Sequence, residues 1–265
     1  MSVEFTVVIP TYNRANFVQR AIRSVIRQTY SNWKILIIDD ASTDKTEKVV
    51  QKYLYHPNVF YHRLLKNVGI SKVLNEAMNL VTTNYMVQLD SDDWLPRKAL
   101  QRLANGIIRN KEKAALYYGN IATWKYHNGQ FSFKSKVVHR QFKSKYSFLR
   151  FTGVIMAPRC YKVSALKSVG GWDTSDKFGG RYMEDRRIIL RLIERYKLKW
   201  INKTMYNRTK HEKQLTNPKH IEKRNHLRKR TIRFYLKRWG NKYKPIFGFR
   251  NKYVVVKRLV KRKKK

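Results

Sequence analysis

Short apolar segments and amphipathic segments alternate along the first part of the chain. In the amphipathic segments, apolar residues recur every three or four positions, as on one face of a helix; Phe17, Ala21 and Val25 are an example. Strands and helices that alternate with short links predict a parallel sheet covered by helices. The expected strands lie at 4–10, 33–38, 59–62 and 85–89, and the expected helices lie at 17–28, around 49–53, around 73–81 and at 96–108.

The pattern changes after the fourth strand and helix. Strands are expected at 114–124 and 130–138, joined by a turn at Asn128-Gly129, and a further strand at 151–157. Helices are expected at 161–169, 184–196 and 219–239, and an apolar and then polybasic tail at 253–265. We therefore expect a nucleotide-binding half at 1–110, a smaller mixed half at 111–217 and a basic helical extension at 218–265.

Polar clusters stand directly after three of the predicted strands. They are Thr11-Tyr12-Asn13, Asp39-Asp40 and Asp90-Ser91-Asp92. The carboxyl ends of parallel strands meet at one edge of a sheet, where α/β proteins bind ligands. Two carboxylates separated by one residue can both reach a divalent cation, and the cation can bridge to a diphosphate. The alternative for Asp90 and Asp92 is an acidic turn that caps the helix beginning near Pro96.

The composition makes these acids conspicuous. The chain has 265 residues, a formal net charge of +42 and only 17 acidic residues. From Asn207 to Lys265 there are 23 Lys or Arg residues and two acids, which indicates an anionic partner. The single cysteine, Cys160, excludes an internal disulfide and suits a reducing compartment. Without a signal sequence or an apolar run of about 18 residues, the expected location is cytoplasmic.

Six sequence elements, taken in order, resemble the family 2 glycosyltransferases, which have the GT-A fold. The resemblance covers roughly residues 3 to 215. It implies an α/β fold with a mostly parallel nucleotide-binding sheet flanked by helices and a smaller mixed acceptor-binding half. The elements are Val7-Val8-Ile9-Pro10-Thr11-Tyr12-Asn13-Arg14, Ile38-Asp39-Asp40-Ala41-Ser42-Thr43-Asp44, Asn67-Val68-Gly69 with Asn75, Leu89-Asp90-Ser91-Asp92-Asp93, Gly170-Gly171-Trp172-Asp173 and Glu184-Asp185.

The resemblance also implies a binding site for a nucleotide-sugar donor, expected to be a UDP-sugar. Asp39 would accept a hydrogen bond from a uracil-like ring nitrogen, and Gly69 would let the backbone approach the nucleotide closely. For Asp39, capping of the following helix is the alternative. The residues assigned to the donor are Thr11, Tyr12, Asn13, Asp39, Asn67, Gly69, Lys72 and Asp90, with Lys72 facing the diphosphate and Asp90 nearer the ribose.

The same resemblance implies a divalent metal, Mn²⁺ or Mg²⁺. Asp92 is the expected direct ligand, and Asp90 is assigned to the metal as well, through its bound waters. His211 falls where many members of the family carry a histidine that approaches the metal or the diphosphate. The metal would neutralise the charge that builds on the departing diphosphate. A histidine that is merely exposed on a basic loop is the alternative for His211.

For catalysis, the resemblance implies inversion at the anomeric carbon. Asp185 is the expected general base, which would deprotonate an acceptor hydroxyl. The alternative is that Asp185 only stabilises the first turn of its helix. Asp173, Glu184 and Trp172 are assigned to the acceptor site, with the Trp172 ring as a stacking surface for a sugar. Packing of Trp172 in the core is its alternative.

The sequence therefore predicts an inverting, non-processive glycosyltransferase of cell-surface or envelope glycan synthesis. Its acceptor would be a hydroxyl of a glycan or a lipid-linked molecule. A Gln-x-x-Arg-Trp motif and membrane spans, expected of a processive synthase, are missing. We expect residues 218–265 to contact the inner face of an anionic membrane or a polyanionic acceptor; a solvated tail is the alternative. The competing function is a nucleic-acid-binding or polyanion-binding protein, which the charge favours and no motif supports.

Overall fold

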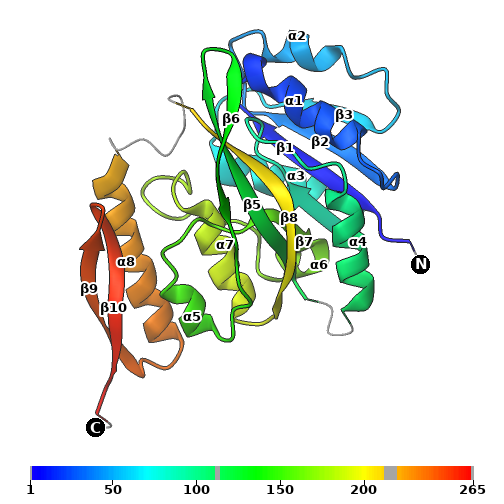
Figure 1. Ribbon diagram of the computed structural model, residues 1–265. Coiled ribbons are helices and arrows are strands. Elements are labelled where there is room, and N and C mark those ends of the chain that lie inside the picture. Colours follow the sequence, from blue (N-terminus) through cyan, green and yellow to red (C-terminus); the bar gives the residue numbers. More distant parts are fainter. Residues whose placement is uncertain (1, 111–113, 212–219, 264–265) are drawn as a thin grey trace.

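The computed structural model describes residues 2–110, 114–211 and 220–263. Its centre is a twisted sheet with helices on both faces (Figure 1). Within these residues the neighbouring strands follow the order β3-β2-β1-β4-β7-β5-β6, and β8 pairs with β5 on a separate branch. The predicted α/β fold with a mostly parallel sheet in its first half is confirmed.

The first half of the sheet is parallel, as the alternating pattern predicts. Strand β1 pairs with β2 on one side and β4 on the other, and β3 pairs with β2. The strands are β1 (Phe5–Thr11), β2 (Trp33–Asp39), β3 (Val59–Arg63) and β4 (Tyr85–Gln88). The helices between and after them are α1 (Ala15–Ile26), α2 (Thr46–Gln51), α3 (Ile70–Leu80) and α4 (Ala99–Arg109).

Successive residues of β1 point to opposite faces of the sheet and so belong to two different cores. Val7 and Ile9 pack on one face with the apolar sides of α1 and α4. Val8, between them, packs on the other face with α3 and with the helices of the second half. This period of two explains why the strand is apolar throughout: both of its faces are covered.

In the second half, the predicted hairpin is confirmed and one predicted strand is wrong. Strands β5 (Leu116–His127) and β6 (Gln130–Val137) are joined by Asn128 and Gly129, both with positive φ, 46° and 79°. A strand was expected at 151–157, but β7 spans Ala157–Lys162, antiparallel to β4. The polar residues of β7 hid it, because Arg159 points into a buried polar site. Short helices α5 (Lys145–Leu149) and α6 (Val163–Ser168) flank this region.

Two elements carry the predicted catalytic and metal residues of the second half. Helix α7 (Glu184–Ile193) begins with Glu184 and Asp185. Strand β8 (Leu198–Lys210) runs parallel to β5 and ends next to His211. The sequence pattern did not reveal β8, because its partly exposed, Lys-rich and Asn-rich surface lacks a run of apolar residues.

The basic C-terminal segment folds into a helix and a hairpin. Helix α8 (Ile221–Arg238) corresponds to the helix expected at 219–239, and strands β9 (Tyr243–Arg250) and β10 (Tyr253–Lys261) pair antiparallel. The tail expected at 253–265 is therefore a strand over most of its length. Ile232 and Leu236 of α8 pack into the same core as α7, beside which α8 lies (Figure 1). None of the described helices is long and apolar enough to cross a membrane.

The predicted limits of the halves and the extension, at 110 and 217, stay predictions.

Docking of α8 can be tested by comparing two apolar residues of that helix. Leu236 is 2% exposed and Phe234 is 56% exposed. We expect Leu236→Ala to lower the free energy of unfolding by about 2–5 kcal/mol, because it leaves a cavity. Phe234→Ala should change it by less than about 0.5 kcal/mol. Chemical denaturation of both variants measures this; equal, small effects would mean that α8 is not part of the core.

Candidate active site

The loops after β1 and β2 are tied to each other by Asn13. Its backbone N–H donates to Ser42 Oγ at 2.9 Å, and its side-chain Oδ1 accepts from Thr43 N at 2.8 Å. Asn13 has a φ of 51°, which an asparagine tolerates better than most residues. Asn13 therefore holds the two loops together. Its predicted contact with the nucleotide-sugar donor stays a prediction.

Thr11 and Asp39 sit at the paired ends of β1 and β2. Asp39 is fully buried; one carboxylate oxygen accepts from Ser42 N and the other from Tyr61 Oη, both at 2.8 Å. The Thr11 hydroxyl is buried without a hydrogen-bond partner among the described residues, which leaves it able to bind a ligand. Tyr12 is 42% exposed. Contact of Thr11, Tyr12 and Asp39 with a nucleotide base stays a prediction.

Asp40 organises the loop that precedes α3. Its two carboxylate oxygens accept from Val68 N at 2.6 Å and Gly69 N at 2.9 Å. Burial raises the pKa of Asp40, whereas these backbone N–H groups act against the shift. Gly69 has a φ of +87°, and a Cβ there would lie 2.9 Å from Arg181 Cγ. Glycine is therefore required at this position, both for its backbone conformation and for the close approach of Arg181.

Asn67 and Lys72, both assigned to the donor, line one basic pocket of about 470 Å³. The pocket lies between the start of α3 and the loop that precedes α7. Arg181 closes one side of it and donates from Nη1 to Asn67 Oδ1 at 3.0 Å. Its other lining residues are Lys66, Val68, Lys177, Phe178, Gly179 and Tyr182. Four cationic side chains make the pocket suited to an anionic ligand such as a diphosphate.

The three aspartates after β4 have three different partners. Asp90 forms an ion pair with Arg159, at 3.0 Å, and its backbone N–H donates to Tyr206 Oη at 3.1 Å. Asp93 is buried, and one of its carboxylate oxygens accepts from Thr209 N at 2.7 Å. Burial, and next the charge of Asp92, raise the pKa of Asp93 well above its ordinary value. Asp93 is therefore enclosed and held by the backbone of β8, whereas the side chains of Asp90 and Asp92 are partly exposed, at 40% and 17%.

Asp92 meets His211 from the far end of the chain. Nε2 of His211 lies 2.9 Å from Oδ2 of Asp92, and the His211 ring stacks on Phe17 at a centroid distance of 4.7 Å. Arg20 of α1 donates to the Asp92 carbonyl at 2.6 Å and so fixes the turn. His211 is thus not an exposed loop residue: its side chain is 5% exposed.

The donor atoms of this pair fit a divalent cation. A carboxylate oxygen and an imidazole nitrogen are ligands that Mn²⁺ accepts, and both converge on one spot. Among the residues that the structure describes, no three His, Cys, Asp or Glu side chains form a group that could hold a metal alone. The diphosphate and water would have to supply the other ligands. Asp90 is held by Arg159, and metal binding by Asp90, Asp92 and His211 stays a prediction.

The start of α7 brings Glu184 and Asp185 close to the same site. Asp185 Oδ1 accepts from Arg186 N at 2.6 Å. Burial raises the pKa of Glu184 to about 8, and the nearby charge of Asp185 adds to the shift. Burial acts to lower the pKa of Arg159, but the charges of Asp90 and, more weakly, Asp185 raise it above its ordinary value. Arg159 therefore lies within electrostatic reach of both the aspartate cluster and the start of α7.

The Gly-Gly-Trp-Asp loop differs from its prediction. Trp172 is 2% exposed and packs edge-on against Tyr161, with ring centroids 5.5 Å apart. Trp172 is a core residue, so the predicted stacking surface for a sugar is wrong. Asn75 of α3 holds the Trp172 backbone from both sides, at 2.7 and 2.8 Å. Asp173 pairs with Arg187, and contact with an acceptor remains a prediction for Asp173 and Glu184.

Sequence reasoning missed several residues of this site. They lack a motif of their own, because each is defined by a partner far away in the chain. The only available signal was the scarcity of acids. With few carboxylates and many arginines, each buried carboxylate is expected to pair with a particular arginine, but the sequence does not say which one. The missed residues are Phe17, Arg20, Arg159, Arg181, Tyr206 and Thr209.

Comparison with known proteins decides the family. Residues 6–169 match the family model described as glycosyl transferase family 2. The chain belongs to this family. The match covers the parallel half of the sheet and continues through β7 and α6. The family predicted from the six sequence elements is confirmed.

Curated relatives of this family 2 chain include polysaccharide synthases. It is 29% identical over 226 residues to the hyaluronan synthase of Pasteurella multocida, covering 84% of the chain and 22% of that protein. It is 27% identical over 249 residues to the chondroitin synthase of Escherichia coli, covering 91% of the chain and 34% of that protein. The chain thus spans about a fifth to a third of the length of these two relatives.

Solved structures share the fold. TarS of Staphylococcus aureus, residues 1–349 in complex with UDP, aligns with a TM-score of 0.63 and 20% identity, over 78% of this chain and 61% of that one. The mannosyltransferase PcManGT of Pyrobaculum calidifontis, in complex with GDP-Man and Mn²⁺, aligns with a TM-score of 0.58 and 20% identity, over 86% and 62%. The GT-A architecture predicted for family 2 is confirmed.

The raised pKa of Glu184 predicts a pH-dependent stability. The unfolded state loses this proton near pH 4.5, whereas the folded state keeps it until about pH 8. Stability should therefore fall as pH rises between these values, by up to about 1.4 kcal/mol per pH unit. The Gln side chain in Glu184→Gln is neutral at every pH, so the variant should lack this slope. Its free energy of unfolding should therefore rise relative to that of the wild type as pH increases toward 8.

Denaturation of both proteins between pH 4 and 9 measures the difference. Glu4→Gln provides the control, because Glu4 forms a half-exposed pair with Lys34. A stability difference between wild type and Glu184→Gln that does not change with pH would show that Glu184 is charged in the folded protein.

Proposed function

We propose that the protein is an inverting, metal-assisted glycosyltransferase that moves a sugar from a nucleotide diphosphate to an acceptor hydroxyl. Membership of glycosyl transferase family 2 supports the reaction class. The observation that supports a metal is the 2.9 Å contact between Asp92 and His211, two residues that are far apart in the chain. A carboxylate oxygen and an imidazole nitrogen at this separation are both ligands that Mn²⁺ accepts.

We take the donor to be a UDP-sugar held at the carboxyl edge of the parallel strands. The Thr11 hydroxyl, which has no hydrogen-bond partner among the described residues, and the exposed Tyr12 support a base pocket there, with Asp39 paired to Thr11 across the strands. The basic pocket at Asn67 and Lys72 supports a place for the diphosphate. The fold neighbour TarS has been solved with UDP and with UDP-GlcNAc, and PcManGT with GDP-Man, so a uridine donor is the first choice to test.

In the proposed mechanism, Asp92 and His211 would hold a divalent cation, which would supply positive charge next to the leaving diphosphate. Asp185 takes the proton of the acceptor hydroxyl as that oxygen attacks the anomeric carbon from the opposite side. The hydrogen bond from Arg186 N orients its carboxylate. Arg159 fixes Asp90 and keeps the aspartate cluster from repelling the donor.

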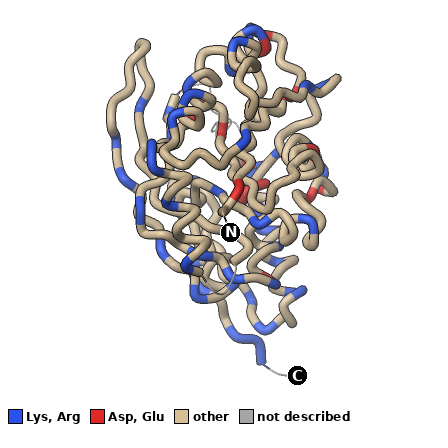
Figure 2. Tube along the Cα trace, turned by 90° about the vertical axis from the view of Figure 1, so that its right-hand side faces the viewer, with Lys and Arg blue, Asp and Glu red and all other residues tan. Residues whose placement is uncertain are grey.

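For the acceptor we propose a glycan or lipid-linked molecule of the cell envelope, reached from the cytoplasmic side of the membrane. Relatives named for hyaluronan, chondroitin and teichuronic acid synthesis support an envelope or capsule role. Residues 220–263 contain 17 Lys or Arg residues and one acid, Glu222. Figure 2 shows these cations along the C-terminal end of the tube. They would attract an anionic membrane or a polyanionic acceptor.

A nucleic-acid-binding function is the second candidate, and the net charge of +42 is the observation that favours it. The family and the aspartates at the strand ends oppose it, because carboxylates repel phosphate where no cation intervenes. A polyanionic acceptor accounts for the same charge without a separate function.

Donor binding is the first expected outcome. Calorimetry with UDP, GDP, dTDP and ADP should show Mn²⁺-dependent binding of UDP. Asp92→Ala and His211→Ala should each weaken it by about 10-fold or more, because each removes a metal ligand. Glu76→Gln, a half-exposed residue on α3, should bind as the wild type does. If no diphosphate binds with Mn²⁺ or Mg²⁺, the donor site is refuted and the basic surface becomes the leading account of function.

The role of Asp185 has its own test. Asp185→Asn keeps the shape of the side chain but removes the base, so turnover should fall by about 10²–10⁴-fold. UDP affinity should stay unchanged. Release of UDP from the UDP-sugar that binds, with water as the acceptor, measures the rate. Normal turnover in Asp185→Asn would leave Asp185 with only its place in the first turn of α7.

A further inference from the structure

Two arginines from different helices meet at a single backbone oxygen beside the predicted base. Arg186, next to Asp185 on α7, donates from Nη1 to the Phe151 carbonyl at 2.5 Å. Arg228 of α8 donates from Nη2 to the same carbonyl at 3.0 Å. One neutral acceptor thus serves two guanidinium groups, which places two positive charges close together at the junction of α7, α8 and the loop after α5.

These cations are short of anionic partners. No carboxylate among the described residues forms an ion pair with Arg186 or Arg228. Arg228 is 8% exposed, and its Nε has no hydrogen-bond partner in the described parts of the chain; the same is true of Nε of Arg224, one turn earlier. Burial, followed by the charge of Arg228, lowers the pKa of Arg186 to about 9, and the nearby charge of Asp185 acts against this shift. Buried cations without an anion are costly, and elsewhere in this protein Arg159 and Arg187 have carboxylate partners.

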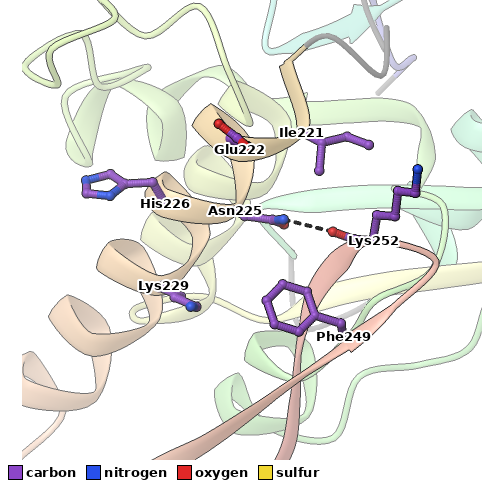
Figure 3. A pocket seen from close by; sticks show the side chains of 7 residues that line it. All are labelled: Ile221, Glu222, Asn225, His226, Lys229, Phe249 and Lys252. Atoms are coloured by element: carbon purple, nitrogen blue, oxygen red, sulfur yellow. Dashed lines mark hydrogen bonds between the residues drawn. The ribbon is translucent and has the colours of Figure 1, made fainter.

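Asn225 and Lys229, the neighbours of Arg228 along α8, line a pocket of about 610 Å³ (Figure 3). Asn225 Nδ2 donates to the Lys252 carbonyl at 2.8 Å and ties α8 to the turn between β9 and β10. Lys229 lies 5.6 Å from the centroid of the Phe249 ring, which is 65% exposed. An exposed aromatic face beside cations and an amide is a surface that suits a charged sugar chain. Ile221, Glu222 and His226 complete the lining.

We propose that Arg186 and Arg228 form a binding site for a phosphate or carboxylate group of the acceptor, with the acceptor chain continuing along α8 past Lys229. The inference rests on the proposed function and gives the acceptor a chemical class, an anionic glycan. Guanidinium groups bind such anions through paired, charge-assisted hydrogen bonds. Because Arg186 directly follows Asp185, an acceptor anchored there would present a nearby hydroxyl to the base.

Direct binding of a small anion tests the proposal. Calorimetry on the full chain, with and without UDP and Mn²⁺, would compare glycerol 3-phosphate and glucuronate with their neutral counterparts glycerol and glucose. We expect both anions to bind and the neutral compounds not to. In Arg228→Gln the Kd for the anions should rise by about 10-fold or more, since a charge-assisted hydrogen bond is lost. Arg230→Gln, an exposed arginine of α8, is the matched control and should bind as the wild type does.

Arg228→Lys covers the case in which the Gln variant does not fold. It keeps the charge and most of the stem but not the planar fork, so the Kd should rise by about 3-fold with an unchanged melting temperature. Wild type that binds neither anion would overturn the proposal. So would anion binding that is unaffected in both Arg228 variants, which would make Arg228 only a latch between α8 and the Phe151 carbonyl. UDP binding in the same samples separates this failure from a failure of the donor site.

Discussion

A buried arginine, Arg159, joins the parts of the molecule that the chemistry needs. It lies on β7, the strand that continues the parallel half of the sheet antiparallel to β4. From there it pairs with Asp90 at the end of β4 and lies within reach of the charge of Asp185 on α7. A guanidinium buried this deeply is stable only with a carboxylate partner. The relative placement of the aspartate cluster and α7 therefore depends on this one cation.

Around that pair, identical side chains have acquired different tasks through their surroundings. Asp93 is enclosed, Asp90 forms an ion pair with Arg159, and Asp92 faces His211. Asp39 and Asp40 are used largely to hold loops, through Ser42 N and Tyr61 in one case and the backbone of residues 68–69 in the other. In a chain with 59 basic residues and 17 acids, almost any carboxylate could find a cation. Burial and nearby backbone N–H groups, more than net charge, decide which carboxylates pair with a cation and which hold a loop.

Local patterns predicted the parallel half well, because a strand covered on both faces must be apolar along its whole length, as β1 is. They failed for β7 and β8, whose buried polar residues serve the site, and for Trp172, whose motif position suggested a sugar contact although its ring packs on Tyr161. The order of the motifs predicted the aspartate cluster and Asp185. Residues defined by a distant partner, such as Arg159 and Phe17, had no signal, since tertiary contacts alone give them their place.

The contact between Asp92 and His211 joins residues that are 119 positions apart in the sequence. Bringing such distant segments together costs chain entropy, and no local preference helps to recover it. The predicted metal-binding geometry can therefore exist only after β8 has paired with β5 and docked beside α4. A ligand bridging Asp92 and His211 would bind the native state and not the unfolded chain, and it would hold the segments that follow β4 and β8 together. Such a ligand would then stabilise the folded protein, and the protein without ligand would be the form most easily degraded by proteases.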